Sequence, residues 1–114
     1  MRPQKLAEFR KKVDKYVARC FAQGKSTRAQ DLARLFGLSP SSFSNSFLAT
    51  VGERPGAYLK RKQIERAKNL LRTTTDNMET IATASGYRNR ETFFPAFRRA
   101  TGMTPKQFRE STAE

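Results

Sequence analysis

Residues 86–109 have the sequence GYRNRETFFPAFRRATGMTPKQFR, in which turn signals alternate with apolar positions at helical spacing. Gly86 and Gly102 can adopt the positive φ that ends helices, so a helix is expected between them. Phe93 and Phe97 are four positions apart and therefore share one face of that helix. The segment predicts a turn, a helix with a buried phenylalanine face, and a second turn that leads into another short helix.

The same pattern occurs earlier in the chain. Three positions recur at an offset of 49 residues and five at an offset of 50, so the second copy has one additional residue between its glycine and its first phenylalanine. The matched pairs are Leu32/Ile81, Ala33/Ala82, Gly37/Gly86, Phe43/Phe93, Phe47/Phe97, Gly52/Gly102, Pro55/Pro105 and Tyr58/Phe108. In each copy an alanine permits close helix crossing and a glycine permits a sharp turn. The repeat predicts two helix-turn-helix units.

Capping signals place the remaining helices. An apolar stripe from Leu6 to Phe21, ended by Gly24, predicts the first helix, and Cys20 lies on that stripe as a small buried residue. The other expected starts are a Thr27–Gln30 capping box for a helix over 28–36, Ser39-Pro40 for 40–51, Pro55 for 55–72, an Asp76–Glu79 capping box, Asn89, and Thr104-Pro105. No segment has strand periodicity. The sequence therefore predicts an all-α fold of about seven helices.

The composition limits the chemistry. The 114 residues include 23 Lys and Arg against 10 Asp and Glu, a net charge of +13, which favours a polyanionic partner, with nucleic acid ahead of a membrane surface. There is no His and one Cys, which excludes His-based acid–base catalysis, His/Cys metal sites and an intrachain disulfide. No apolar run approaches the roughly 18 residues that span a bilayer. We expect a cytoplasmic, nucleoid-associated protein with no cofactor, metal or membrane partner.

The runs 37–47 and 86–109, with the basic segment after Pro55, resemble the DNA-binding domain of AraC/XylS transcription regulators. The resemblance covers nearly the whole chain. It implies a first helix-turn-helix subdomain with an N-terminal helix over 1–54, a rigid linker helix over 55–72 and a second subdomain over 73–114. It also implies that the two units enter successive major grooves of double-stranded DNA. Independently, a linker of this length spans about 25 Å, which suits sites one duplex turn apart.

The resemblance identifies candidate base-contacting residues on the second helix of each unit. In the first unit they are Ser41, Ser44 and Asn45, which can hydrogen-bond base edges but lack the bidentate contact of arginine with guanine. In the second unit Arg90 can reach guanine or a phosphate, and Glu91 can accept from cytosine or support the capping turn.

In the second unit the other outward positions that correspond to the family's base-contacting ones hold Phe94 and Pro95. Pro95 departs from the family, which often has a basic residue there. A proline early in this helix removes one intrahelical hydrogen bond and is expected to bend the helix near its start. We therefore expect the second unit to contact mainly the DNA backbone and the first unit to carry most of the sequence preference.

Basic residues elsewhere are candidates for contacts with DNA phosphates, which raise affinity without sequence preference. They are Arg10, Lys11 and Lys12 on the first helix, Lys60, Arg61 and Lys62 on the linker, and Arg98 and Arg99 near the end of the second recognition helix. Lys62 stands where an apolar residue is common in the family. For any of these residues, the alternative role is a solvated surface that keeps the protein soluble.

Together these features predict a sequence-specific DNA-binding transcription regulator of bacterial type, without enzymatic chemistry. The family analogy favours an activator that contacts RNA polymerase, and no small-molecule ligand is expected in this chain. Two alternatives stay open: a basic helical protein that binds nucleic acid without sequence preference, and the DNA-binding half of a larger effector-responsive regulator. An enzyme is disfavoured because the acids near the second unit, Asp76, Glu79 and Glu91, have capping explanations.

Overall fold

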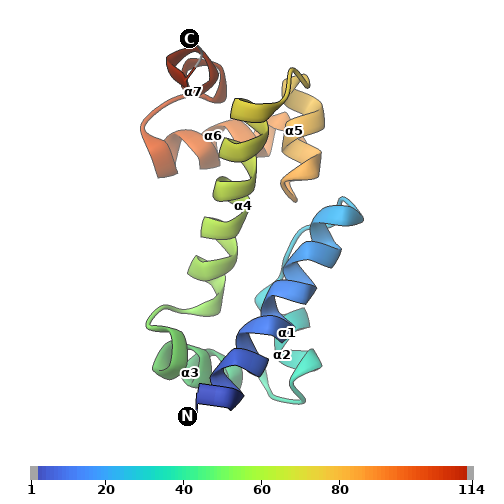
Figure 1. Cartoon of the computed structure of the whole chain (residues 1–114), viewed down its shortest axis with the longest axis vertical. Helices are drawn as coiled ribbons and strands as arrows, with labels where there is room; N and C mark the ends of the chain where they lie inside the picture. The colour runs from blue at the N-terminus through green and yellow to red at the C-terminus, as the bar shows by residue number, and fades with distance from the viewer. Residues whose placement is uncertain (1–2, 113–114) are drawn as a thin grey trace.

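The computed structural model describes the backbone of residues 3–112 and the side chains of residues 5–112. This part of the chain contains seven α-helices and no strand, which confirms the all-α prediction. The helices are α1 (Pro3–Ala22), α2 (Ala29–Leu35), α3 (Pro40–Val51), α4 (Pro55–Thr73), α5 (Met78–Ala84), α6 (Arg90–Thr101) and α7 (Pro105–Thr112). Figure 1 shows α4 as a central rod, with α1–α3 at one end and α5–α7 at the other. Across the described residues, no helix is both long enough and apolar enough to cross a membrane.

Three of the predicted helix starts are confirmed in detail. The Ser39 hydroxyl accepts from the Ser42 backbone N–H, and Pro40 is the first residue of α3. The Asn89 side chain accepts from the Thr92 N–H at the start of α6, with the reciprocal contact back to the Asn89 N–H. At α7 the hydroxyl of Thr104 and the amide of Gln107 exchange hydrogen bonds with each other's backbone N–H groups.

The two other capping predictions are wrong. The N-cap of α2 is Arg28, not Thr27, and its side chain makes no capping hydrogen bond. The Tyr16 hydroxyl on α1 holds this start instead, because it accepts from the Arg28 N–H at 2.9 Å and donates to the Arg28 carbonyl at 3.2 Å. The N-cap of α5 is Asn77, whose side-chain oxygen accepts from the Thr80 N–H at 2.8 Å, one residue later than the Asp76–Glu79 pair suggested.

Two hydrophobic cores lie at opposite ends of α4. The first contains Val13, Tyr16, Val17, Cys20, Leu32, Ala33, Phe43, Phe47 and Leu59. The second contains Ile64, Ala67, Leu71, Ile81, Ala82, Phe93 and Phe97. Ala33 and Ala82 are at most 1% exposed, as expected at close helix crossings, and Cys20 is buried as predicted. Since α4 contributes side chains to both cores, it is part of each unit and not a free tether.

The carbonyl of Gly86, in the turn between α5 and α6, joins the two ends of the molecule. It accepts hydrogen bonds from the Ser26 hydroxyl in the α1–α2 loop at 2.6 Å and from the Gln63 side-chain amide on α4 at 3.1 Å. Gln63 is only 8% exposed, so this hydrogen bond satisfies a buried polar group. A Cβ at position 86 would lie 3.0 Å from the Gln63 amide nitrogen and 3.4 Å from the Lys25 carbonyl oxygen. This junction therefore brings the first unit, the linker and the second unit together at one atom.

Substituting Gly86 tests the close packing of the junction. Gly86 and Gly52 have φ of +85° and +91°, so replacing either with alanine is expected to cost about 1–2 kcal/mol of backbone strain. Only at Gly86 does the added Cβ meet other atoms, because nothing lies within 4 Å of a Cβ built at Gly52. Denaturant unfolding should show a larger loss for Gly86→Ala than for Gly52→Ala. Equal losses would argue against a tightly packed junction.

Candidate nucleic-acid interface

The outward face of α3 carries the predicted base-contacting residues of the first unit. Phe43 and Phe47 are buried in the first core, and this fixes the rotation of the helix. Ser41 and Asn45 are consequently exposed, and Ser44 is half-buried. Their hydroxyl and amide groups can donate to or accept from base edges. The helix itself contains no basic residue.

Sequence reasoning missed one basic residue beside this face. Arg54 is the exposed N-cap of α4, and its Nη1 donates to the Ser44 hydroxyl oxygen at 2.8 Å and to the Asn45 side-chain oxygen at 3.4 Å. The guanidinium thus lies against two of the three predicted base-contacting residues. The internal repeat could have drawn attention to Arg54, because the matching position in the second unit, 104, holds threonine, a common capping residue.

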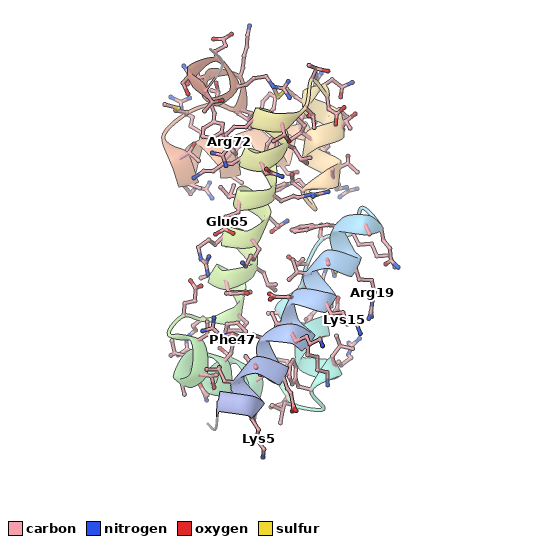
Figure 2. The ribbon with its side chains drawn as sticks, in the orientation of Figure 1. Lys5, Lys15, Arg19, Phe47, Glu65 and Arg72 are labelled. Atoms are coloured by element: carbon pink, nitrogen blue, oxygen red, sulfur yellow. The ribbon has the colours of Figure 1, made fainter. Side chains whose placement is uncertain are left out.

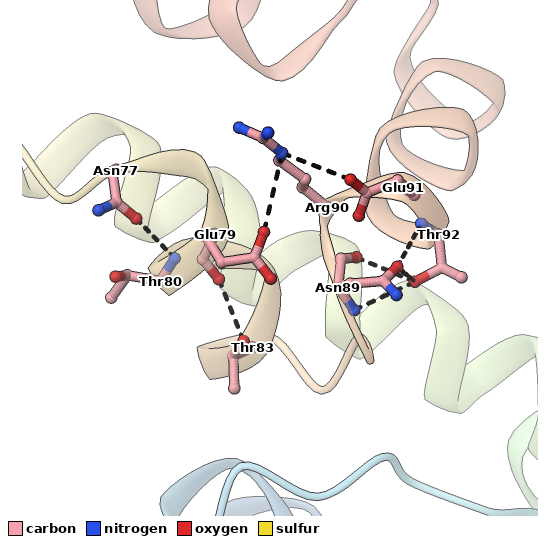
Figure 3. Close-up of polar contacts among 8 residues, drawn as sticks. All are labelled: Asn77, Glu79, Thr80, Thr83, Asn89, Arg90, Glu91 and Thr92. Atoms are coloured by element: carbon pink, nitrogen blue, oxygen red, sulfur yellow. Dashed lines mark hydrogen bonds and ion pairs between the residues drawn. The ribbon is translucent and has the colours of Figure 1, made fainter.

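The start of α6 holds the predicted base-contacting residues of the second unit (Figure 3). Arg90 and Glu91 are both exposed at the first turn. The Arg90 Nε lies 3.8 Å from a carboxylate oxygen of Glu79 on α5 and 3.6 Å from one of Glu91. With its side chain 58% exposed, Arg90 remains accessible, but part of its charge is balanced within the protein.

The outward surface of α6 continues through Phe94 and Pro95. The helix runs unbroken from Arg90 to Thr101 with Pro95 as its sixth residue. Phe94 is 37% exposed, which is high for a phenylalanine, and its ring packs against that of Phe93 at 5.9 Å. The face that corresponds to Ser44 and Asn45 of the first unit is therefore apolar.

The three basic residues at the middle of α4 have different surroundings. Arg61 places Nη2 2.6 Å from Glu53 and Nη1 2.8 Å from Glu65. The hydrogen bond that Arg61 donates to Glu53, and to a lesser extent the one it donates to Glu65, raises the pKa of Arg61 above its ordinary value. The Lys62 Nζ lies 3.7 Å from a carboxylate oxygen of Glu65 and 5.4 Å from the centre of the Tyr58 ring. Lys60 and Arg61 are both exposed, but of the three residues Lys60 alone makes no ion pair within residues 5–112.

A cleft of about 550 Å³ lies between α4 and α6. Its lining includes the basic residues Lys60, Lys68 and Arg99, the acidic residue Glu65, and Tyr87, whose pKa is raised by burial. Lys68 was not among the predicted phosphate contacts. The spacing of Lys60 and Lys68, two helical turns apart, could have identified it. Arg98 and Arg99 are both exposed and form no ion pair in the part of the chain that the structure describes.

The structure does not bring Arg10, Lys11 and Lys12 to one side of α1, because consecutive residues point about 100° apart around a helix. Arg10 lies with Phe47 and Tyr58 around a small cavity, whereas the Lys12 ammonium lies 4.6 Å from the centre of the Phe36 ring. Lys15 and Arg19 lie on the outer side of α1, away from α4 (Figure 2).

Tyr58 ties α1 to α4 at this end of the molecule. Its hydroxyl donates to Asp14 on α1 at 3.1 Å. Burial, together with the nearby Asp14 carboxylate, raises the pKa of Tyr58 to about 12, so the hydroxyl remains a hydrogen-bond donor at neutral pH. This bond holds the basic N-terminal helix against the linker.

Two helix-turn-helix units on a shared helix, with exposed basic residues beside the outward helices, define a DNA-binding domain of the helix-turn-helix class. The family model described as a helix-turn-helix domain matches residues 32–111. The chain belongs to the AraC/XylS family of transcription regulators, as the sequence resemblance predicted. It is a DNA-binding domain of that family and not an enzyme.

Named relatives share this region. The chain is 36% identical over 90 residues to the HTH-type transcriptional regulator Rv1931c of Mycobacterium tuberculosis. The aligned region covers 79% of this chain and 35% of the relative. It is 29% identical over 90 residues to the xylose operon regulatory protein of Escherichia coli. That aligned region covers 79% of this chain and 23% of the relative. The chain thus spans about a quarter to a third of the length of these relatives.

Solved structures have the same fold. The C-terminal domain of the two-component response regulator yesN from Fusobacterium nucleatum aligns with a TM-score of 0.74 at 27% identity, over 85% of this chain and 97% of that one. The DNA-binding domain of the global transcriptional factor AdpA, solved with a target DNA, aligns with a TM-score of 0.75 at 24% identity, over 93% of this chain and 90% of that one.

Pro95 is expected to lower the stability of α6, and its replacement tests this expectation. Proline at the sixth helical position cannot donate to the Glu91 carbonyl, and its ring crowds that carbonyl. Because Pro95 is exposed, Pro95→Ala and Pro95→Arg should both raise the melting temperature, with a gain of up to about 3 kcal/mol for alanine. Thermal unfolding followed by circular dichroism measures the change. A lower melting temperature for both variants would mean that the proline suits this helix.

Proposed function

We propose that the domain binds double-stranded DNA by placing α3 and α6 in successive major grooves on one face of the duplex. The observation that carries this proposal is the position of α3 and α6 at opposite ends of α4 (Figure 1). The 19 residues of α4 span about 28 Å at 1.5 Å per residue. With a helix radius added at each end, this length suits sites one helical turn of DNA apart, about 34 Å. One copy of the domain would then make a two-site contact.

We assign residues 1–54 to the first subdomain, 55–72 to the linker helix and 73–114 to the second subdomain. Each helix-turn-helix unit has its own core, which supports this division. The hydrogen bonds to the Gly86 carbonyl from Ser26 and Gln63 favour a fixed orientation of the two units. A fixed orientation would favour one spacing between the two DNA sites, because no reorganisation is needed on binding.

We propose that the first unit contacts bases and that the second unit contacts mainly phosphates. Ser41, Ser44 and Asn45 would hydrogen-bond base edges from α3. In the second unit the ion pairs of Arg90 and the apolar surface of Phe94 leave fewer polar groups for base reading. Arg98 and Arg99, with Lys60 and Lys68 along the cleft, would instead contact phosphates.

The regulatory role is proposed from the family. The domain would act on transcription in the bacterial cytoplasm, at nucleoid DNA, as an activator that contacts RNA polymerase. Since the chain spans a quarter to a third of its named relatives, a longer protein would supply any effector-binding or dimerisation half. No small-molecule ligand is assigned to this domain.

The experiment that tests the proposal is selection of bound sequences from a random duplex pool. A specific regulator should enrich a bipartite sequence with two elements about one duplex turn apart. Competition among the selected duplex, a scrambled duplex and a structured RNA then separates this function from nonspecific binding. Equal binding of all three would support a basic protein without sequence preference.

The salt dependence of binding tests the proposed phosphate contacts. If Lys60, Lys68, Arg98 and Arg99 each neutralise one phosphate, the logarithm of the binding constant should fall against the logarithm of salt concentration with a slope of about −3.6 or steeper. Fluorescence anisotropy between low and moderate salt provides the measurement. A slope near −1 would contradict the phosphate contacts assigned to the basic residues.

Arg90 and Lys60 are predicted to act differently on binding. If Arg90 reads a guanine, Arg90→Ala should weaken binding to the selected duplex by about 1–3 kcal/mol and relax preference at one base pair. Lys60→Ala should weaken selected and scrambled duplexes equally, because phosphates occur in both. If Arg90→Ala also weakened both duplexes equally, its role would be phosphate contact.

A further inference from the structure

The internal repeat isolates Arg54 as an unusual residue. Its counterpart in the second unit, fifty positions later, is Thr104, which caps α7 through its hydroxyl. Arg54 occupies the N-cap position of α4 but makes no capping hydrogen bond with its side chain. The first unit therefore lacks a stabilising contact that the second unit retains.

The Arg54 side chain lies across α3 instead. One nitrogen, Nη1, donates to the Ser44 hydroxyl at 2.8 Å and to the Asn45 amide oxygen at 3.4 Å. No acidic side chain pairs with Arg54 among residues 5–112, in contrast to Arg61, which pairs with two. The Nε–H and Nη2 edge of the guanidinium has no hydrogen-bond acceptor within that part of the chain. A planar pair of donors is thus presented beside the outward face of α3.

The acceptors of this arginine are specific to the first unit. At the same offset of fifty residues, Ser44 and Asn45 correspond to Phe94 and Pro95, whose side chains accept no hydrogen bond. The arginine and both of its acceptors therefore occur together in one unit and are all replaced in the other. This joint difference favours a function at α3 over a chance surface contact.

We propose that Arg54 is a specificity-determining residue that reads a guanine in the major groove contacted by α3, with Ser44 and Asn45 holding its guanidinium in place. The proposal rests on the DNA-binding function proposed above. Since α3 contains no basic residue, Arg54 supplies the bidentate donor that this helix lacks, and the guanine O6 and N7 atoms are its acceptors. A phosphate offers a similar pair of acceptors, so the test must distinguish the two.

The informative variant is Arg54→Thr, which introduces the residue that caps α7 in the second unit. Because threonine can cap α4, this variant should fold with a melting temperature at or above that of the original protein. It should nevertheless bind the selected duplex about 5- to 150-fold more weakly and lose preference at one guanine. Arg54→Lys keeps the charge without the planar donor pair, so it should retain affinity for scrambled DNA and lose the guanine preference.

A base analogue identifies the atom that is read. Replacing the guanines of the selected duplex one at a time with 7-deazaguanine removes N7 while leaving the phosphates unchanged. The original protein should lose affinity at one guanine, and Arg54→Thr should show no further loss there. Arg19→Gln is the matched control, since it removes one positive charge from the outer side of α1 (Figure 2) and should keep the 7-deazaguanine profile unchanged.

The other outcomes overturn the assignment. Equal weakening of selected and scrambled duplexes by Arg54→Thr, with the 7-deazaguanine effect retained, would indicate phosphate contact. Unchanged affinity and preference in this variant would show that the contact with α3 serves the fold alone. Failure to enrich any sequence from the random pool would overturn the proposed function itself, and with it the role of Arg54.

Discussion

The geometry of the whole domain depends on the hydrogen bonds to one carbonyl oxygen, that of Gly86. A carbonyl has two lone pairs, and here one donor comes from the α1–α2 loop and the other from the linker helix. Glycine is needed at this position both for its positive φ and because a Cβ would meet the Gln63 amide. These hydrogen bonds, together with the close approach of the Lys25 carbonyl and the Phe21 ring to Gly86, restrict rotation of the two units about α4. The spacing between α3 and α6 therefore depends on the junction as well as on the length of the linker.

The two units show which positions a helix-turn-helix keeps constant and which it varies. The matched phenylalanines are fully buried in both units, and the alanine at each helix crossing is equally inaccessible, because both pack against the same arrangement of helices. The outward positions differ: Ser41, Ser44 and Asn45 correspond to Glu91, Phe94 and Pro95. A common scaffold thus presents a polar surface from one unit and a largely apolar surface from the other.

The net charge of +13 does not by itself locate a binding surface. Arg61 and Arg90 lie close to carboxylates of the same chain, so they are less available to a partner than composition suggests. Arg109 serves the fold, because its guanidinium donates to the carbonyls of Leu71, Thr74 and Asp76 and holds the α4–α5 connection against α7. Positive residues with no ion pair in the described part of the chain, such as Lys60 and Arg99, are better candidates for contacts with an anion.

The amino-acid sequence alone determined the seven helices, the two repeated units and the buried faces. These features follow from local rules: apolar spacing selects a helix face, and glycine, proline and capping side chains mark where helices end. It did not determine where α2 begins, since the Tyr16 hydroxyl from another helix sets that start. Nor did it reveal the contacts of Ser26 and Gln63 with Gly86, or those of Arg54 with α3. These contacts join residues that are distant in the chain or project from different helices, so only the packing of those helices brings their polar atoms within hydrogen-bond distance.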